Sequence, residues 1–268
     1  MSYKVFENPA GKLGIRSHLL VLPSVVCSTH VSRKVANQVG AITFAHQHGC
    51  GIIGNDVGGI RDFFVSLARQ PNVGPVLIIG LGCETIQGNE LAEAVKAVNP
   101  VTEYLVIQES GGMAQTLSRG ISAANALKTN FVAKTSTSNS LRIGIDAAQN
   151  DQKIKELQDY LTYFQTVVAP SLKNSGLRFS ALMEENVQLI VSLVEPEQPA
   201  SGFPTIPTIN IAATSTLHQL TQSDFDLPAT FSKKDLLDLI SKVANGELTK
   251  SEISQTGEII APRMVRSV

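Results

Sequence analysis

Four short apolar runs in the first 110 residues each lead directly into polar and reactive side chains. The runs cover residues 19–22, 41–45, 76–82 and 104–107, and segments with a helical spacing of apolar residues separate them. Near-continuous apolar runs that alternate with helices are typical of a parallel sheet that is buried on both faces. The pattern therefore predicts an α/β fold, with a Rossmann-like parallel sheet in the N-terminal part of the chain.

Capping and helix-breaking residues predict where the intervening helices begin and end. The first helix begins at residue 28 or 29 and ends before Gly40, because glycine is the residue type that most often follows a helix. Three further helices are predicted, from Asp56 to before Pro71, from Asn89 to before Pro100, and from after Gly112 to about Leu127. Right-handed crossovers through these helices bring the ends of the strands to one edge of the sheet.

The pattern changes after about residue 127. Residues 134–140 are polar and are predicted to form a linker, and a strand is expected at 141–146. Residues 183–194 fit either a helix or a buried strand, since periodicity does not distinguish the two here. The remaining predicted elements are a helix from Asp151, a strand at 206–212 and a helix that starts at a capping box, Ser232–Asp235. We therefore expect an α/β domain at 1–130 and a smaller, shortened α/β region at 131–268.

Composition narrows the class of protein. The chain has 268 residues, of which 43% are hydrophobic and 17% charged, as is ordinary for a globular protein with a large core. Its net charge of −1, without a run of Lys or Arg and without Trp, does not favour nucleic-acid binding. No apolar stretch reaches the roughly 18–20 residues that span a membrane, and the N-terminus does not resemble a signal peptide. The odd number of cysteines, three, disfavours a disulfide framework, so a reducing, cytoplasmic location is expected.

Cysteine and histidine side chains gather just beyond the predicted strands. Each of them alone is more often an ordinary buried residue than part of a site. Together they favour a metal site or a nucleophilic thiol, because imidazole and thiolate are ligands that suit Fe(II) or Zn(II). The residues in question are Cys27, His46, Cys50 and Cys83.

Other candidates near the same edge have more than one interpretation. His48 can ligate a metal, donate a proton or face solvent. Gly111 and Gly112 lie between a strand and a helix, where free backbone N–H groups bind anions, although an ordinary tight turn has the same sequence. Arg61 can bind a carboxylate with its planar fork or lie exposed on its helix. The Gly-x-Gly sequence at 80–82 does not continue as a dinucleotide fingerprint, so no NAD site is predicted.

The sequence around these strand ends resembles the altronate/galactarate dehydratase family, whose members include sulfolactate sulfo-lyase. The matching segments read VVCS at 25–28, AHQHGCG at 45–51, ARQPNV at 68–73, VLIIGLGCE at 76–84 and VIQESGG at 106–112. Together they extend over about residues 14–127, in the order and spacing of the second-domain region of that family. A weaker match returns at 204–213 and 243–250, where the family has its C-terminal strand and final helix.

The resemblance implies a hydro-lyase that acts on a sugar acid, with Fe(II) as the usual metal and Mn(II) or Zn(II) as alternatives. In that reaction a base removes the proton next to the carboxylate, the β-hydroxyl leaves as water, and the product is a 2-keto-3-deoxy acid. The resemblance assigns metal binding to Cys27, His46, Cys50 and Cys83, a base or acid role to Glu84 or His48, and substrate binding to Gln108, Gly111 and Gly112. Which residue removes the proton does not follow from the sequence.

The chain departs from the family pattern in its second half. Residues 141–149 stand where the family has a Cys-Gly-Gly-Ser-Asp motif, the following region is shorter, and this sequence has no counterpart of the small β-rich N-terminal domain. The leading hypothesis is a sugar-acid dehydratase or its large subunit, with a separate small β-rich (SAF-like) subunit as a partner. The alternatives are a catalytically degenerate homologue that binds a sugar acid or a partner protein, and a thiol-dependent enzyme that uses Cys83. A homodimer is expected from the prevalence of two-fold symmetry.

Overall fold

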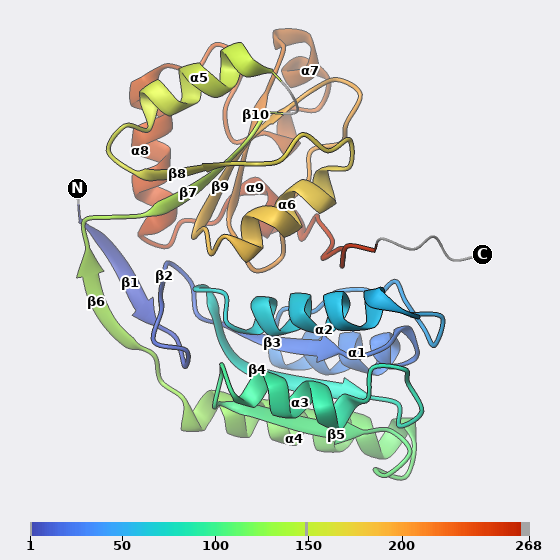
Figure 1. Ribbon diagram of the computed structural model, residues 1–268. Coiled ribbons are helices and arrows are strands. Elements are labelled where there is room, and N and C mark those ends of the chain that lie inside the picture. The colour runs from blue at the N-terminus through green and yellow to red at the C-terminus, as the bar shows by residue number, and fades with distance from the viewer. Residues whose placement is uncertain (1, 148–149, 264–268) are drawn as a thin grey trace. The chain divides into compact units, whose positions relative to one another are not determined.

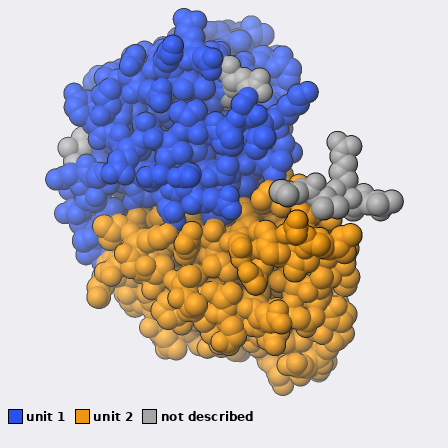
Figure 2. Space-filling view, viewed as in Figure 1, with its two compact units in different colours: residues 1–5, 135–258 blue, residues 6–134, 259–268 orange. Residues whose placement is uncertain are grey.

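The chain folds into two compact units. The computed structural model describes residues 2–147 and 150–263 (Figure 1). We call Phe6–Lys134 together with the segment from Ile259 the N-terminal unit, and the first five residues together with Thr135–Glu258 the C-terminal unit (Figure 2). The division expected from the sequence, 1–130 and 131–268, does not include this return of residues 259–263 to the N-terminal unit.

A three-stranded parallel sheet forms the centre of the N-terminal unit. Its order is β3-β4-β5, and it consists of β3 (His18–Pro23), β4 (Val73–Gly80) and β5 (Thr102–Val106). Every residue of the central strand β4 is buried. These strands confirm three of the four apolar runs and the parallel α/β fold expected from them.

The fourth apolar run, at 41–45, does not form a full strand. Only Ile42 forms a bridge with β3, opposite Leu20. Its backbone is hydrogen-bonded to Leu19 and Val21, the two neighbours of Leu20. The pairing stops there because the hydroxyl of Thr43 donates to the carbonyl of Val21 at 2.8 Å and so contacts the strand through a side chain instead of the backbone ladder. The prediction of a strand over 41–45 is therefore wrong beyond this single bridge.

Four helices surround this sheet: α1 (Thr29–Val39), α2 (Asn55–Ala68), α3 (Gly88–Lys96) and α4 (Met113–Asn130) (Figure 1). The prediction that Gly40 ends the first helix is confirmed, since Gly40 has a left-handed backbone with φ 60°. The predicted cap Asp56 is wrong, because Gly54 is the N-cap and Asp56 lies buried in the first turn of α2. One hydrophobic core joins α1 and α4 to the sheet through residues that include Val35, Leu77, Ile79 and Ala124.

The C-terminal unit has a second parallel sheet, of order β10-β9-β7-β8. Its strands are β7 (Arg142–Asp146), β8 (Gln165–Val168), β9 (Leu189–Val194) and β10 (Thr208–Ala212), and its helices are α5 (Asp151–Tyr160), α6 (Ser175–Glu184), α7 (Ser215–Leu220), α8 (Lys233–Ala244) and α9 (Lys250–Ser254). Residues 183–194, for which the sequence allowed either a helix or a strand, contain the last residues of α6 and then strand β9. The predicted capping box is confirmed, because the side chains of Ser232 and Asp235 bond reciprocally to each other's backbone N–H.

The predicted linker at 134–140 is wrong over most of its length. Residues Lys134–Ser138 form strand β6, which belongs to a small sheet of order β2-β1-β6 with β1 (Tyr3–Glu7) and β2 (Leu13–Gly14). Its two threonines explain this, since β-branched residues favour strands even where the strand is largely exposed. The short 3₁₀ helices η1 (Val26–Ser28) and η2 (Gln222–Asp224) complete the described elements. No helix within the described ranges is long and apolar enough to cross a membrane.

Candidate functional site

The order of strands in the N-terminal sheet reverses beside β3. The segment at Ile42 bridges β3, and the next strand along the chain, β4, also pairs with β3. In open α/β sheets ligands bind beyond the carboxyl ends of the strands, at the point where the strand order reverses. Ser24 and Glu84 follow the two strands that meet there, and their side chains are hydrogen-bonded at 2.8 Å.

Glu84 is a buried carboxylate that neutral donors hold in place. Besides the hydroxyl of Ser24, the backbone N–H groups of Leu81 and Gly82 donate to it at 3.3 and 2.6 Å, and the residue is only 2% exposed. A side chain at Gly80 would lie 2.4 Å from Oε1 of Glu84, so only glycine leaves room for this carboxylate. No ion pair joins Glu84 to another residue in the described part of the chain. The carboxylate therefore lies at the strand ends without a neutralising cation.

Tyr104 of β5 supplies an O–H group beside Glu84. Burial, with smaller contributions from the charges of Glu84 and Glu109, raises the pKa of Tyr104 to about 12. A side chain at Gly80 would lie 2.9 Å from its hydroxyl oxygen, and one at Gly88 would lie 2.2 Å from it. Two glycines therefore shape the space in which a protonated phenol faces a buried carboxylate.

His46 is a buried, neutral imidazole with one unused N–H group. It is 2% exposed, and the ring of Phe64 lies against it with the two centroids 5.2 Å apart. Burial, assisted by the nearby His48, lowers the pKa of His46 to about 4. The backbone N–H of His48 donates to Nδ1 of His46 at 3.0 Å, so the proton of the neutral ring is on Nε2. That Nε2 has no hydrogen-bond partner among the described residues.

His48 is a partly buried imidazole beside His46. Burial is the largest cause that lowers its pKa, followed by the positive charge of Arg263, while the carbonyls of Ala261 and Gln47 and the charge of Asp56 act in the opposite direction. Its Nε2 has no hydrogen-bond partner in residues 2–147 and 150–263. The two imidazole rings meet edge to face with centroids 6.0 Å apart. Two neighbouring imidazoles thus each have a buried Nε2 atom without a hydrogen-bond partner among the described residues.

The cysteines predicted as ligands are free and exposed. The Sγ atom of Cys50 lies 3.7 Å from the carbonyl oxygen of Cys83, and the amide of Gln108 lies 3.9 Å from the Sγ atom of Cys83. The structure therefore brings Cys50, Cys83 and Gln108 together. Cys27 lies in η1, next to Val26, whose N–H donates to the carbonyl of His48 at 2.9 Å.

These side chains do not form a ligand set as they are placed. Within the described ranges no three His, Cys, Asp or Glu side chains come together around a position for a metal ion. His46 is also unsuited in this tautomer, because a metal-bound imidazole donates its other N–H, whereas Nδ1 of His46 accepts a hydrogen bond. The residues present therefore do not fit a resident metal in this arrangement, and metal binding by Cys27, His46, Cys50 and Cys83 stays a prediction.

The predicted substrate-binding residues Arg61, Gly111 and Gly112 lie on the surface or in a turn. Arg61 bonds to its neighbour Asp62 at 3.0 Å, and its side chain is 48% exposed. Gly111 and Gly112 have φ angles of 88° and 94°, which explains why both are glycine. The N–H of Gly112 donates to the carbonyl of Ile107 at 3.0 Å, so this group is not available for an anion.

Residues 259–263, which the sequence analysis did not single out, contact the loop that carries His46 and His48. We call this loop the histidine loop. The amide of Gln47 donates to the carbonyl of Ile259 at 2.8 Å. The guanidinium of Arg263 contacts Oδ2 of Asp56 at 3.3 Å and the carbonyl of Gly51 at 3.2 Å. Arg263 is 207 positions from Asp56, and no motif around it indicates this contact.

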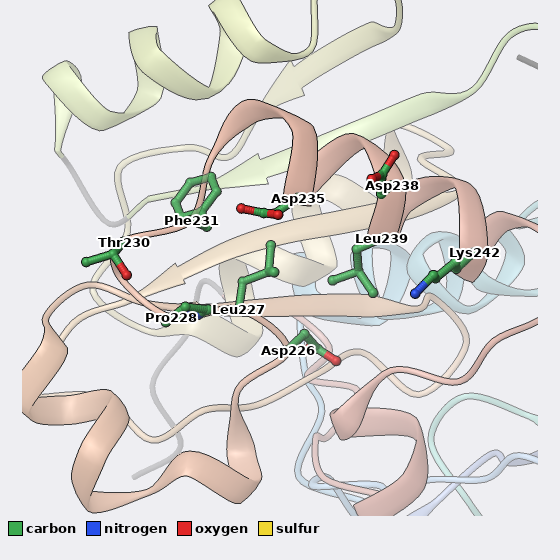
Figure 3. Close-up of a pocket in the computed structure, with 9 residues that line it drawn as sticks. All are labelled: Asp226, Leu227, Pro228, Thr230, Phe231, Asp235, Asp238, Leu239 and Lys242. Atoms are coloured by element: carbon green, nitrogen blue, oxygen red, sulfur yellow. The ribbon is translucent and has the colours of Figure 1, made fainter.

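A pocket in the C-terminal unit contains none of the predicted site residues (Figure 3). It lies between α8 and the segment before it, and its lining residues are Asp226, Leu227, Pro228, Thr230, Phe231, Asp235, Asp238, Leu239 and Lys242. Two of its three acids have structural roles, since Asp235 belongs to the capping box and Asp238 pairs with Lys234. The histidine loop of the N-terminal unit is therefore the better candidate site.

The fold and the site together define a parallel α/β domain with acid–base groups at the carboxyl edge of its sheet. Residues 5–131 match the domain family described as D-galactarate dehydratase/Altronate hydrolase, second domain. This match, over slightly less than half of the chain, confirms the predicted resemblance to the altronate/galactarate dehydratase family, and His46, His48 and Glu84 lie within it.

Two curated relatives carry the same name. An altronate dehydratase of Escherichia coli (strain K12) is 30% identical over 115 residues, which are 39% of this chain and 23% of that protein. An altronate dehydratase of Bacillus subtilis (strain 168) is 28% identical over 109 residues, 37% of this chain and 22% of that protein. The chain thus matches less than a quarter of the length of these relatives.

Proposed function

We propose that this chain is a sugar-acid dehydratase of the altronate type, or the large subunit of one. The observation that carries this proposal is the histidine pair inside the family-matched segment. His46 offers a buried N–H group beside His48, and neither Nε2 atom has a partner among the described residues. Buried polar groups in native proteins are nearly always hydrogen-bonded, so two unused groups side by side favour a polar ligand between them.

In the proposed reaction His48 is the general base. Its Nε2 removes the proton from the carbon next to the carboxylate, and its lowered pKa keeps the imidazole neutral and able to accept that proton near neutral pH. The Nε2–H of His46 donates to the oxygen on which negative charge develops. The imidazolium of His48 then gives its proton to the β-hydroxyl, which leaves as water. The resulting enol tautomerises to the 2-keto-3-deoxy acid.

Glu84 and Gln108 have supporting roles in this proposal. Glu84 is bonded by Ser24 and by two N–H groups of its own turn, which supports a role in holding that turn rather than in removing a proton. Gln108 has its amide beside Cys83 and is exposed, which supports contact with a substrate hydroxyl. A base role for Glu84 stays the alternative to His48.

A metal, further subunits and an oligomer remain part of the proposal without a step assigned to them. Fe(II), with Mn(II) or Zn(II) as alternatives, is tested by metal analysis of protein purified without air. A small β-rich subunit is proposed because the family that this chain resembles has a small β-rich domain. A homodimer and a cytoplasmic location are likewise proposed and are tested by light scattering and by cell fractionation.

A second candidate function is binding without catalysis. The chain has no Cys-Gly-Gly-Ser-Asp motif at 141–149, so a homologue that has kept the fold and binds a sugar acid or a partner protein also agrees with the sequence. This candidate predicts that the chain binds the acid but gives no product with any added metal.

The test is conversion of D-altronate by the full chain, with and without Fe(II) and in the absence of air. Mass spectrometry is expected to detect a product lighter by one water, and the His48→Gln variant is expected to lose roughly 10²- to 10⁴-fold in rate. His30→Gln is the matched control, because His30 is exposed on α1. Binding of D-altronate without product identifies the degenerate homologue, and a fully active His48→Gln variant rules out His48 as the base.

A further inference from the structure

We infer that Arg263 binds the carboxylate of the acid substrate. This role deepens the proposed function and rests on it, because the ligand is taken to be a sugar acid. Arg263 lies outside the family-matched segment 5–131, yet it contacts the loop that carries His46 and His48.

The segment around Arg263 contacts the N-terminal unit with every second residue. Ile259 is fully buried and accepts a hydrogen bond from Gln47, Ala261 is 4% exposed and faces His48, and Arg263 reaches Asp56. The residues between them, Ile260 and Pro262, are more exposed. This alternation is typical of an extended chain with one face against a surface. The contacts therefore hold Arg263 in a defined place beside the histidines.

Arg263 keeps unused hydrogen-bond donors. A guanidinium has five N–H groups, and here Nε donates to Asp56 and Nη2 to the carbonyl of Gly51. Both N–H groups of Nη1 make no bond to any residue in the described ranges. The side chain of Arg263 is 14% exposed, so its free end is both partly desolvated and open to a ligand. A planar fork in this state is suited to receive a carboxylate.

Asp56 orients the guanidinium of Arg263 and leaves its other N–H groups available. The single contact between the two side chains is 3.3 Å long, and Asp56 is only 2% exposed. An arginine can bond one carboxylate through Nε and a second through its other end. Arg61, the arginine first expected to bind the substrate, has both Nε and Nη2 bonded to Asp62 on the surface of α2. Of these two arginines, Arg263 is therefore the one beside the histidine pair with donors to spare.

The charge and the two imidazoles fit one ligand class. A 2,3-dihydroxy acid presents a carboxylate, an adjacent carbon-bound proton and a β-hydroxyl within a few bonds. Arg263 on the carboxylate would place that proton near the imidazole of His48, whose pKa the charge of Arg263 already lowers. The segment 259–263 would then determine the preference for acids over uncharged sugars.

The experiment compares D-altronate with its neutral amide, D-altronamide, as calorimetric probes of the full chain. Wild type is expected to prefer the carboxylate. Arg263→Gln is expected to weaken altronate binding roughly 10- to 100-fold while leaving the amide unchanged, because a charge-assisted hydrogen bond is lost. Arg263→Lys keeps the charge without the fork and is expected to fall between the two. Arg61→Gln is the matched control and is expected to bind both probes like wild type.

Each other result is decisive. Equal weakening of altronate and altronamide by Arg263→Gln would show a merely structural role and overturn the inference, as would a wild type without preference for the carboxylate. An Arg263-dependent preference without turnover supports the inference and removes the dehydratase function. Turnover of altronate with an unchanged KM in the Arg263→Gln variant supports the dehydratase function and overturns the inference.

Discussion

Both parallel sheets of this chain have a buried carboxylate bonded to a serine at their carboxyl ends. The two sheets differ in whether a cation pairs with that carboxylate. Each sheet has a buried carboxylate bonded to a serine of the neighbouring strand or strand end: Glu84 to Ser24 at 2.8 Å, and Asp146 to Ser192 at 3.1 Å. In the C-terminal unit Arg178 pairs with the carboxylate, with Nε 2.5 Å from Oδ1 of Asp146. In the N-terminal unit no described cation pairs with Glu84.

The arginines of the two units differ in the same way. Arg178 uses all five donors, on Asp146 twice, on the carbonyls of Leu172 and Lys173, and on the side chain of Gln198. Arg263 uses two, on Asp56 and on Gly51. A fully bonded buried cation can do nothing but hold its surroundings together. The two units therefore differ in that Arg178 has all its donors bonded to the protein, whereas Arg263 has donors without a partner among the described residues.

The largest effect is expected when the cation that pairs with Asp146 in the C-terminal unit is removed. Arg178→Ala leaves Asp146 buried without its cation, and is expected to lower the free energy of unfolding by roughly 3–5 kcal/mol, measured by urea denaturation. The double variant Arg178→Met with Asp146→Leu removes both charges and is expected to recover most of that loss. A single variant as stable as wild type would contradict the structural role of the pair.

The second prediction concerns the neutral histidines of the N-terminal unit. Burial lowers the pKa of His46 to about 4, below its usual 6.5, so the unfolded chain binds the proton more tightly and stability must fall as the pH falls from 6.5 towards 4. The difference of about 2.5 in pKa corresponds to about 3 kcal/mol. Urea denaturation at pH 7 and pH 4.5 checks this, and His46→Phe is expected to lose that part of the pH dependence. His30→Gln is expected to keep it.

The third prediction compares a glycine in each sheet. Gly80→Ala would place a methyl group 2.4 Å from Oε1 of Glu84, whereas Gly144→Ala would meet a methyl group of Leu182 at 2.8 Å. A flexible leucine can move aside, but Glu84 is fixed by three hydrogen bonds. We expect Gly80→Ala to cost about 1–3 kcal/mol in thermal denaturation and Gly144→Ala less. The reverse order would show that Glu84 is not held as described.

The smallest expected effect completes the comparison of the two arginines. Arg263→Gln removes the contacts of a partly exposed side chain with Asp56 at 3.3 Å and with the carbonyl of Gly51 at 3.2 Å, so its cost in the free energy of unfolding is expected to be about 1 kcal/mol. The same variant is the one expected to lose carboxylate binding. A loss of stability as large as that of Arg178→Ala would remove the distinction between the two arginines.

Local patterns in the sequence predicted the parts of the fold that local interactions determine. Strand β4 is a nearly continuous apolar run, Gly40 ends α1, and the capping box of α8 needs only Ser232 and Asp235. The strand β6 was not predicted, because its serines and threonines are mostly exposed and read as a linker. Hydrophobic patterning carries no signal for a strand that buries no face.

The site was predictable only as far as strand ends determine it. The position of Glu84 after β4 follows from the apolar run before it. The tautomer of His46 and the pKa of His48 depend on which groups reach each ring, and these contacts do not appear in the order of residues. The contact of Arg263 with Asp56 joins residues 207 positions apart, which no local pattern can reveal.

The return of residues 259–263 to the N-terminal unit has a consequence for how the chain is made. The ribosome synthesises Phe6–Lys134 first, but the segment that covers the histidine loop follows the whole of Thr135–Glu258. At the usual rate of about 5–20 residues per second, the growing N-terminal unit waits roughly 6–25 seconds for that segment. During that interval the histidine loop is uncovered on the nascent chain, so the N-terminal unit can be completed only after the C-terminal unit has been synthesised.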